Sequence, residues 1–126
     1  MMKRRILIVD DEIGMARALA WYLSENGDCD VRVENVGSRT LASAREFRPA
    51  LIVMDVVMPD ADGATLAAEI QADAVLQTTP IVFLTGLASQ HEECGGPTRI
   101  AGLPFLPKPI DPDAVLAYIE QHATTH

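Results

Sequence analysis

Four apolar runs in the sequence are closely followed by polar groups that could take part in chemistry. These groups are Asp10, Asp11 and Glu12 after the first run, Asp55 after the second, Thr85 after the third and Lys108 after the fourth. Any one of them alone is explained well enough as a turn residue, a helix cap or a solvated side chain. Acids, a hydroxyl and an amine at four run ends are harder to explain as local turn chemistry, and together they predict one site.

The acidic groups of this set predict a metal site. Carboxylates that lie close together repel one another and raise one another's pKa, so a cluster of Asp10, Asp11 and Asp55 needs a cation. Hard carboxylate oxygens favour Mg²⁺, which keeps several waters and takes one or two protein carboxylates plus a phosphate oxygen. We therefore expect Mg²⁺ as the cofactor.

Lys108 lies in the stretch FLPKPID (105–111), between two prolines. Proline fixes its own φ, donates no backbone hydrogen bond and restricts the residue before it. A long, flexible side chain confined in this way is predicted to be held against a specific partner.

The elements that must position these groups follow from the alternation of apolar runs with segments of helical periodicity. Five strands are predicted, at 6–9, 30–33, 50–54, 81–84 and 105–106. The predicted strands at 6–9, 50–54 and 81–84 are continuously apolar, which is typical of strands buried on both faces of a parallel sheet. The pattern predicts an open α/β sheet with helices on both faces, whose strands end at one common edge.

Start and stop signals mark several of the helices. Gly27 predicts the end of the first helix, and Ser38 is expected to cap the second. Asp111 followed by Pro112 predicts the start of the last helix.

The segment between the fourth and fifth strands does not fit a regular helix. It contains Gly95, Gly96 and Pro97. In a helix interior, each glycine costs about 1 kcal/mol and a proline about 3 kcal/mol. The fourth helix is therefore expected to be short or broken, and residues 89–103 are expected to be the most mobile part of the domain.

Composition excludes several classes of protein. The chain has 126 residues, which fits one domain, and its net charge of −8 argues against direct binding of nucleic acid or anionic lipid. No window is long enough and apolar enough to span a membrane. Cys29 and Cys94 belong to no metal-binding or redox spacing, so free thiols in a reducing compartment are expected. These features predict a cytoplasmic protein.

Four stretches of the chain together resemble the receiver domain of two-component response regulators. They are ILIVDDE (6–12), LIVMDVVMPDADG (51–63), IVFLTG (81–86) and FLPKPID (105–111). The resemblance covers essentially the whole chain, so residues 1–126 are interpreted as one receiver, or phosphoacceptor, domain. It implies a flavodoxin-like, doubly wound, five-stranded parallel sheet of order 2-1-3-4-5.

The resemblance also implies a role for each acidic residue of the site. Asp55 would be the phosphoryl acceptor and a Mg²⁺ ligand. Asp11 would bind Mg²⁺ directly, and Asp10 would bind it through a water. The backbone carbonyl of Val57 would supply a further ligand.

The remaining site residues would act on the phosphoryl group or respond to it. Thr85 would donate a hydrogen bond to this group, and Lys108 would pair with one of its oxygens, with a cis bond before Pro109 fixing the approach of the lysine. Thr85 and Phe105 would form the switch that carries the signal. Phe105 stands where a tyrosine is often found, and a plain core aromatic is an alternative interpretation.

The implied function is phosphorelay signal transduction rather than enzymatic turnover. The phosphoryl donor would be a sensor histidine kinase or a histidine phosphotransfer protein. Apolar Val57 and Leu87 stand where polar groups that orient an attacking water are often found, so a long-lived acyl phosphate is expected.

Two alternatives belong to other classes. A receiver fold that no longer switches could serve only for docking, and the irregular fourth helix favours this interpretation while the intact acid, threonine and lysine set opposes it. A haloacid-dehalogenase-like, Mg²⁺-dependent phosphohydrolase would need a second acid two residues after the nucleophile, where this sequence has Val57.

Overall fold

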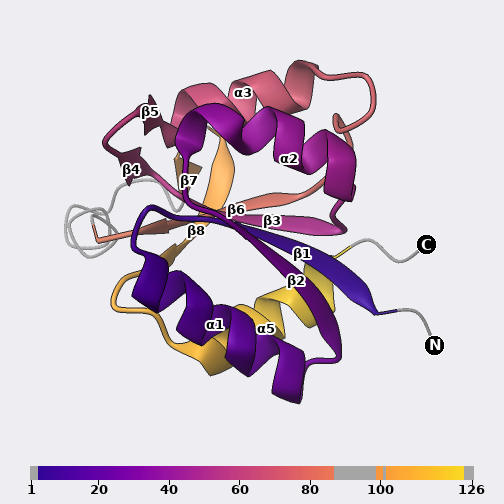
Figure 1. The fold of residues 1–126 in the computed structure, drawn as a ribbon, viewed down its shortest axis with the longest axis vertical. Coiled ribbons are helices and arrows are strands. Elements are labelled where there is room, and N and C mark those ends of the chain that lie inside the picture. The colour runs from indigo at the N-terminus through magenta and orange to yellow at the C-terminus, as the bar shows by residue number, and fades with distance from the viewer. Residues whose placement is uncertain (1–2, 87–98, 101, 124–126) are drawn as a thin grey trace.

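A six-stranded sheet of order β2-β1-β3-β6-β8-β7 forms the centre of the computed structural model, which describes residues 3–86, 99–100 and 102–123 (Figure 1). Five strands run parallel, namely β1 (Arg4–Val9), β2 (Cys29–Glu34), β3 (Leu51–Asp55), β6 (Ile81–Thr85) and β8 (Leu103–Pro107). The short strand β7 (Arg99–Ile100) runs antiparallel along the first half of β8. The predicted order of the parallel strands is confirmed, and β7 is an addition at the sheet edge.

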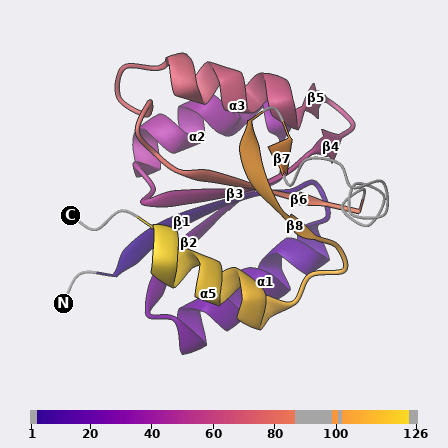
Figure 2. The same cartoon turned by 180° about the vertical axis from the view of Figure 1, so that it is seen from behind.

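Helices cover both faces of this sheet, as predicted (Figures 1 and 2). One face carries α1 (Ile13–Asn26) and α5 (Pro112–His122), and the other carries α2 (Thr40–Phe47) and α3 (Gly63–Ala72). A 3-10 turn, η1 (Gly37–Arg39), leads into α2. Two short strands, β4 (Val57–Met58) and β5 (Ala61–Asp62), pair antiparallel in the loop between β3 and α3.

The hydrophobic core consists of two clusters, one on each side of the sheet. Ile6 and Ile8 of β1 pack into the cluster beneath α1 and α5, and Leu7 and Val9 pack into the cluster beneath α2 and α3. The apolar residues of β3 and β6 alternate in the same way and are buried. Successive side chains of a strand point to opposite faces, so continuous apolar runs give strands that are buried on both.

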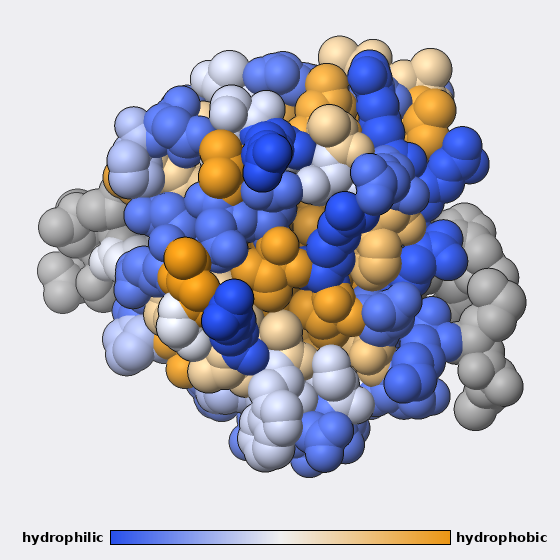
Figure 3. Space-filling model, in the orientation of Figure 1, coloured by the Kyte–Doolittle hydropathy of each residue, from blue (hydrophilic) through white to orange (hydrophobic). Residues whose placement is uncertain are grey.

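The edge strand β2 has a different environment. Its valines, Val31 and Val33, are half-buried, and charged residues alternate with them. Figure 3 shows apolar residues gathered over this strand, between α1 and α2, with hydrophilic residues around them. Half-burial explains why this strand has the weakest apolar pattern of the five.

Two of the predicted helix boundaries are confirmed. Gly27 ends α1, and its N–H donates to the carbonyl of Leu23 at 2.9 Å. Asp111 caps α5 by accepting the N–H of Asp113 at 3.0 Å, and Pro112 occupies the first turn.

The expected capping of the second helix by Ser38 is wrong. Ser38 lies inside η1, and α2 begins after Arg39 without a side-chain cap. The carboxylate of Asp60, from the β4–β5 hairpin, accepts the backbone N–H of Ser38 instead. The Asp60 carboxylate, from a segment 22 residues away in sequence, thus accepts a backbone N–H here, where the Ser38 hydroxyl was expected to act as the cap.

Most of the expected irregular helix, together with the mobility expected of it, falls on residues 87–98, outside the described residues. The described end of that segment is not helical, because Arg99–Ile100 forms β7. Gly102, with φ of +80°, makes the turn from β7 into β8 in a conformation that favours glycine.

Two expectations from composition can be compared with the described part of the chain. No helix within it is long and apolar enough to cross a membrane. Cys29 is buried and forms no disulfide, whereas Cys94 lies outside the described residues.

Candidate metal and phosphoryl site

The carboxyl ends of the parallel strands bring the predicted site residues to one edge of the sheet. Asp55 is the last residue of β3 and Thr85 the last of β6, while Asp10 and Lys108 directly follow β1 and β8. The backbone N–H of Lys108 donates to the carbonyl of Thr85 at 3.0 Å, which fixes the start of the loop after β8.

Three carboxylates gather at this edge. Asp10, Asp11 and Asp55 each offer one oxygen, and these oxygens all lie within 4.8 Å of one another. Asp10 and Asp55 are buried and Asp11 is half-buried. Such a set of hard oxygen donors is what Mg²⁺ prefers.

One oxygen of Asp10 is left without a hydrogen bond. Oδ1 accepts the N–H of Glu12 at 3.0 Å, whereas Oδ2 is buried and has no hydrogen-bond partner among the described residues. A buried acceptor without a partner costs on the order of 1–3 kcal/mol, and more when it is charged. This oxygen has no hydrogen bond, and the Lys108 ammonium faces it at 3.6 Å, so its place beside two other carboxylates fits a bound cation.

Lys108 is the cation that the protein itself supplies to this cluster. Its Nζ lies 3.3 Å from Asp55 Oδ1, 3.6 Å from Asp10 Oδ2 and 3.7 Å from Glu12 Oε1. The Lys108–Pro109 peptide bond is cis. One ammonium faces several carboxylates, so it neutralises the cluster only in part.

The electrostatics of the site follow from burial and from this lysine. Burial raises the pKa of Asp10 and of Asp55, and the neighbouring Lys108 opposes the rise. Burial by itself would lower the pKa of Lys108, but the carboxylates of Asp10 and Asp55 raise it overall. The folded protein therefore holds two carboxylates at an energetic disadvantage and keeps the lysine charged.

The loop after Asp55 stays close to the acid cluster. The backbone N–H of Val57 donates to Asp55 Oδ1 at 3.3 Å, and the Val57 side chain faces solvent, 68% exposed. Gly63 closes this loop by donating to the carbonyl of Val56 at 2.9 Å. A Cβ at Gly63 would lie 2.6 Å from the Asp55 carbonyl oxygen, so only glycine fits there.

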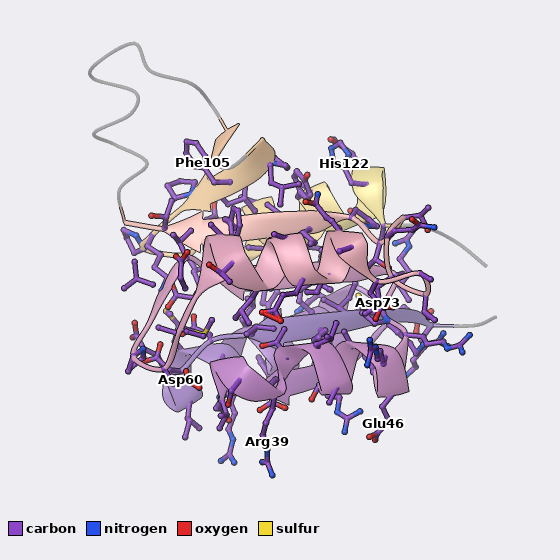
Figure 4. All side chains as sticks on the ribbon, turned by 90° about the horizontal axis from the view of Figure 1, so that it is seen from above. Arg39, Glu46, Asp60, Asp73, Phe105 and His122 are labelled. Carbon is purple, nitrogen blue, oxygen red and sulfur yellow. The ribbon has the colours of Figure 1, made fainter. Side chains whose placement is uncertain are left out.

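The two expected switch residues lie on neighbouring strands. Thr85 is buried at the end of β6, and Phe105 is a half-buried residue of β8 that packs against the cluster beneath α2 and α3 (Figure 4). Strand register pairs Phe105 with Phe83, two residues before Thr85. The fold thus brings Asp10, Asp11, Asp55 and Lys108 together, with Thr85 at the end of the neighbouring strand and Phe105 further inside the sheet.

Sequence reasoning missed three residues that support this edge. Glu12 was noted among the acids, but no role was assigned to it, and it pairs with Lys108. Asn35 donates from Nδ2 to the backbone carbonyl of Asp10 at 2.9 Å, and Asp60 binds the backbone of Gly37 and Ser38. The last two contacts join segments more than 20 residues apart, so no local pattern could have revealed them.

An apolar groove of about 310 Å³ lies between α1 and the start of α5. It is lined by Met15, Ala18, Leu19, Trp21, Tyr22, Ile110 and Pro112. Trp21 is 65% exposed, and the hydroxyl of Tyr22 donates to the carboxylate of Asp113, which ties α1 to α5.

Comparison with known proteins gives a consistent result. The sequence model of the response regulator receiver domain family matches residues 6–120. Response regulator Rre1 of Synechocystis sp. is 31% identical over 114 residues, which are 90% of this chain and 49% of Rre1. Protein PilH of Pseudomonas aeruginosa is 30% identical over 115 residues, which are 91% of this chain and 93% of PilH.

Solved structures agree with these sequence relatives. The chemotaxis response regulator CheY4 of Vibrio cholerae superposes with a TM-score of 0.80 at 26% identity, covering 95% of this chain and 98% of CheY4. The chain spans about half the length of Rre1 and nearly the full length of PilH and CheY4.

Proposed function

Because this chain belongs to the response regulator receiver domain family of two-component signalling, we propose that it accepts a phosphoryl group on Asp55 in a Mg²⁺-dependent reaction. The observation that carries the proposal is the buried Asp55 carboxylate, with Lys108 Nζ at 3.3 Å and two further aspartates within reach of a shared cation. Phosphoryl transfer needs an in-line nucleophile, and it needs cations that neutralise the negative charge on the equatorial oxygens. The Asp55 carboxylate and the Lys108 ammonium support these two roles.

In the proposed reaction a carboxylate oxygen of Asp55 forms a bond to phosphorus. The bond from phosphorus to the donor's imidazole nitrogen breaks, and the imidazole leaves with the electron pair. Lys108, which now contacts Asp55, would pair with a phosphoryl oxygen, and the Thr85 hydroxyl would donate to another. Two positive or donating groups from neighbouring strands would thus hold the transferred group.

Asp11 and Asp55 would hold Mg²⁺ directly, Asp10 would hold it through a water, and the Val57 carbonyl would complete the protein ligands. The unsatisfied Asp10 Oδ2 supports this assignment. When bound, Mg²⁺ neutralises charge that develops on the phosphoryl oxygens.

The proposed donor is a sensor histidine kinase or a histidine phosphotransfer protein. A donor must cover the carboxyl edge of the sheet to reach Asp55, and Ile110, which lines the apolar groove together with Trp21, follows Lys108 by two residues. The net charge of −8 supports the proposal that the domain binds neither nucleic acid nor a membrane directly. A cytoplasmic location is proposed from the sequence, because Cys29 and Cys94 fit no metal-binding or redox spacing.

The proposed switch is a movement of Thr85 toward the phosphoryl group, with Phe105 turning in behind it. Phe105 is half-buried and packs against the cluster beneath α2 and α3, so a turn of its ring would change both that packing and the exposed surface of β8. As a phenylalanine it offers no phenol to hydrogen-bond with a partner, so its output would depend on shape alone.

Intact-protein mass spectrometry after incubation with acetyl phosphate and MgCl₂ tests the proposal. We expect one stable phosphoryl group on the parent and on Asp62→Asn, and none on Asp55→Asn. Asp62 is a matched control, since it is a nearby aspartate whose carboxylate caps α3 through Thr65. Continuous phosphate release would instead identify a phosphohydrolase, and no reaction would leave only a docking module.

A further inference from the structure

The segment of residues 34–38, here called the connector, joins β2 to η1 and contacts both sides of the metal site. At its first end it holds Asp10. The Glu34 carbonyl accepts the N–H of Asp10 at 3.1 Å, and Asn35 Nδ2 donates to the Asp10 carbonyl at 2.9 Å. The backbone of Asp10 is thereby fixed through both its donor and its acceptor.

At its other end the connector holds the loop that follows Asp55. Gly37 N–H donates to Asp60 Oδ1 at 3.1 Å, and Ser38 N–H donates to Asp60 Oδ2 at 3.0 Å. Asp60 lies at the tip of the β4–β5 hairpin, whose first residue is Val57. Both oxygens of one carboxylate therefore tie this hairpin to the connector.

The contact between Gly37 and the β4–β5 hairpin is tightly packed. Gly37 is buried, and a Cβ added there would lie 2.7 Å from the Ala61 Cβ and 2.8 Å from Asp60 Oδ1. Hydrogen bonds from the connector, first from Ser38 and then from Gly37, hold the pKa of Asp60 below its usual range. The carboxylate is therefore ionised, and its bonds are charge-assisted, at neutral pH.

We infer that Asn35 and Asp60 are positioning residues that set the separation between the Asp10–Asp11 pair and the Val57 backbone, and thereby the Mg²⁺ affinity. The inference rests on the proposed function only in taking Mg²⁺ as the ion. Mg²⁺ demands near-ideal octahedral geometry, so a shift of one ligand-bearing segment relative to the other weakens binding. Groups that orient metal ligands without touching the metal typically change affinity by about 10- to 100-fold.

A purely structural interpretation is that Asp60 only caps η1. The two interpretations predict different effects of Asp60 on Mg²⁺ affinity. A cap would change the stability of η1 and leave Mg²⁺ affinity alone, whereas a positioning residue would couple the amides of Gly37 and Ser38 to the metal.

Titration of MgCl₂ into ¹⁵N-labelled protein, followed by NMR, separates them. The matched variants are Asp60→Asn and Asp62→Asn, which remove the same charge from the same hairpin. Asp62 bonds within its own helix start and not to the connector. We expect Asp60→Asn to weaken Mg²⁺ binding by roughly 10-fold more than Asp62→Asn does. We also expect the Gly37 and Ser38 amides to shift with Mg²⁺ in the parent and not in Asp60→Asn.

Asn35→Ala tests the other end of the connector and keeps the inference testable if Asp60→Asn does not fold. It should weaken Mg²⁺ binding without any change of charge. Equal affinities of Asp60→Asn and Asp62→Asn, or Gly37 and Ser38 amides that ignore Mg²⁺ while the parent binds it, would overturn the inference alone. A parent whose signals near Asp11 and Asp55 show no saturating shift would overturn both the inference and the proposed metal site.

Discussion

Two buried carboxylate regions of this molecule have opposite electrostatics. At the carboxyl edge of the sheet, burial raises the pKa of Asp10 and Asp55, and Asp10 Oδ2 lacks a hydrogen bond within the described residues. Beyond the end of α3, Asp73 is also buried, yet it accepts the N–H of Val75 at 2.9 Å and the Arg45 Nε at 2.6 Å. These bonds, the one from Val75 first, hold the pKa of Asp73 below its usual range.

The contrast separates a structural acid from a functional one. Figure 4 shows Asp73 at the other end of the molecule from Asp60, which lies in the hairpin beside the site. Both oxygens of Asp73 accept hydrogen bonds from the fold, and the Arg45 guanidinium balances its charge. The site acids keep oxygens that can still bind a ligand, such as Asp10 Oδ2. Their burial as charged groups lowers the stability of the metal-free folded state, and a bound cation would restore it.

Among the substitutions that test this contrast, Asp73→Ala is expected to lower the stability of the fold most. The substitution leaves the Val75 N–H and the Arg45 guanidinium without their acceptor, so the melting temperature should fall by several degrees. Glu46→Ala is the control, because its ion pair with Arg32 is exposed and such pairs contribute about 0–1 kcal/mol. Equal melting temperatures for the two variants would show that Asp73 is not a structural acid.

The metal-free protein should lose stability as the pH rises above 3.8, the usual pKa of an aspartate. Because burial raises the folded pKa values of Asp10 and Asp55 above 3.8, the folded state there binds more protons than the unfolded chain does. The lowered pKa of Asp73 acts in the opposite sense, below pH 3.8, where stability is lost as the pH falls. Urea unfolding in EDTA, repeated across this pH range, measures the free energy of unfolding on both sides of pH 3.8. A free energy that does not change above pH 3.8 would contradict the raised pKa values of Asp10 and Asp55.

Neutralising one site acid should stabilise the metal-free fold. Asp55→Asn removes a buried charge that is only partly compensated by Lys108, so the free energy of unfolding at pH 7 should rise by about 1 kcal/mol in EDTA. Added MgCl₂ should stabilise the parent more than the variant, since only the parent keeps all three carboxylates. A variant less stable than the parent in EDTA would mean that the Lys108–Asp55 ion pair outweighs the burial of the charge.

The smallest effect is expected from a change beside Asp55 that leaves its carboxylate intact. Val57→Asn places an amide where it can orient a water, so the phosphorylated domain should lose its phosphoryl group a few-fold faster, well below the roughly 10²-fold or more that a positioned general base contributes. Val75→Asn is a matched control, an exposed valine beside Asp73 instead of Asp55. A Val57→Asn lifetime equal to that of the control, measured by mass spectrometry over time, would show that water access sets the rate. Leu87, the other apolar residue expected to protect the phosphoryl group, lies outside the described residues.

The fold could be predicted because its information is local. Continuous apolar runs identified β1, β3 and β6, and residues 30–33 gave a weaker strand candidate that corresponds to β2. The end of α1 at Gly27 and the start of α5 at Asp111 were equally local. Strand β7 was not predicted, because two residues carry too little pattern to reveal a pairing.

For the site, the sequence predicted the functional residues but not the residues that position them. Its members could be recognised because each lies at the end of a strand or just after it, and the topology of a parallel sheet brings such positions together. The residues that hold the site could not. Asn35 and Asp60 act through contacts between distant segments, and the expected cap at Ser38 failed because Asp60 supplied the acceptor from elsewhere.

The two core clusters share no side chain among the described residues, and the sheet lies between them. Substitutions on opposite sides should therefore combine almost additively, within about 0.3–0.5 kcal/mol. In evolutionary terms, the helical layer of α2 and α3 can drift toward new partners without compensating changes beneath α1 and α5. Descendants of such a domain could diverge on one face while the other preserves its ancestral packing.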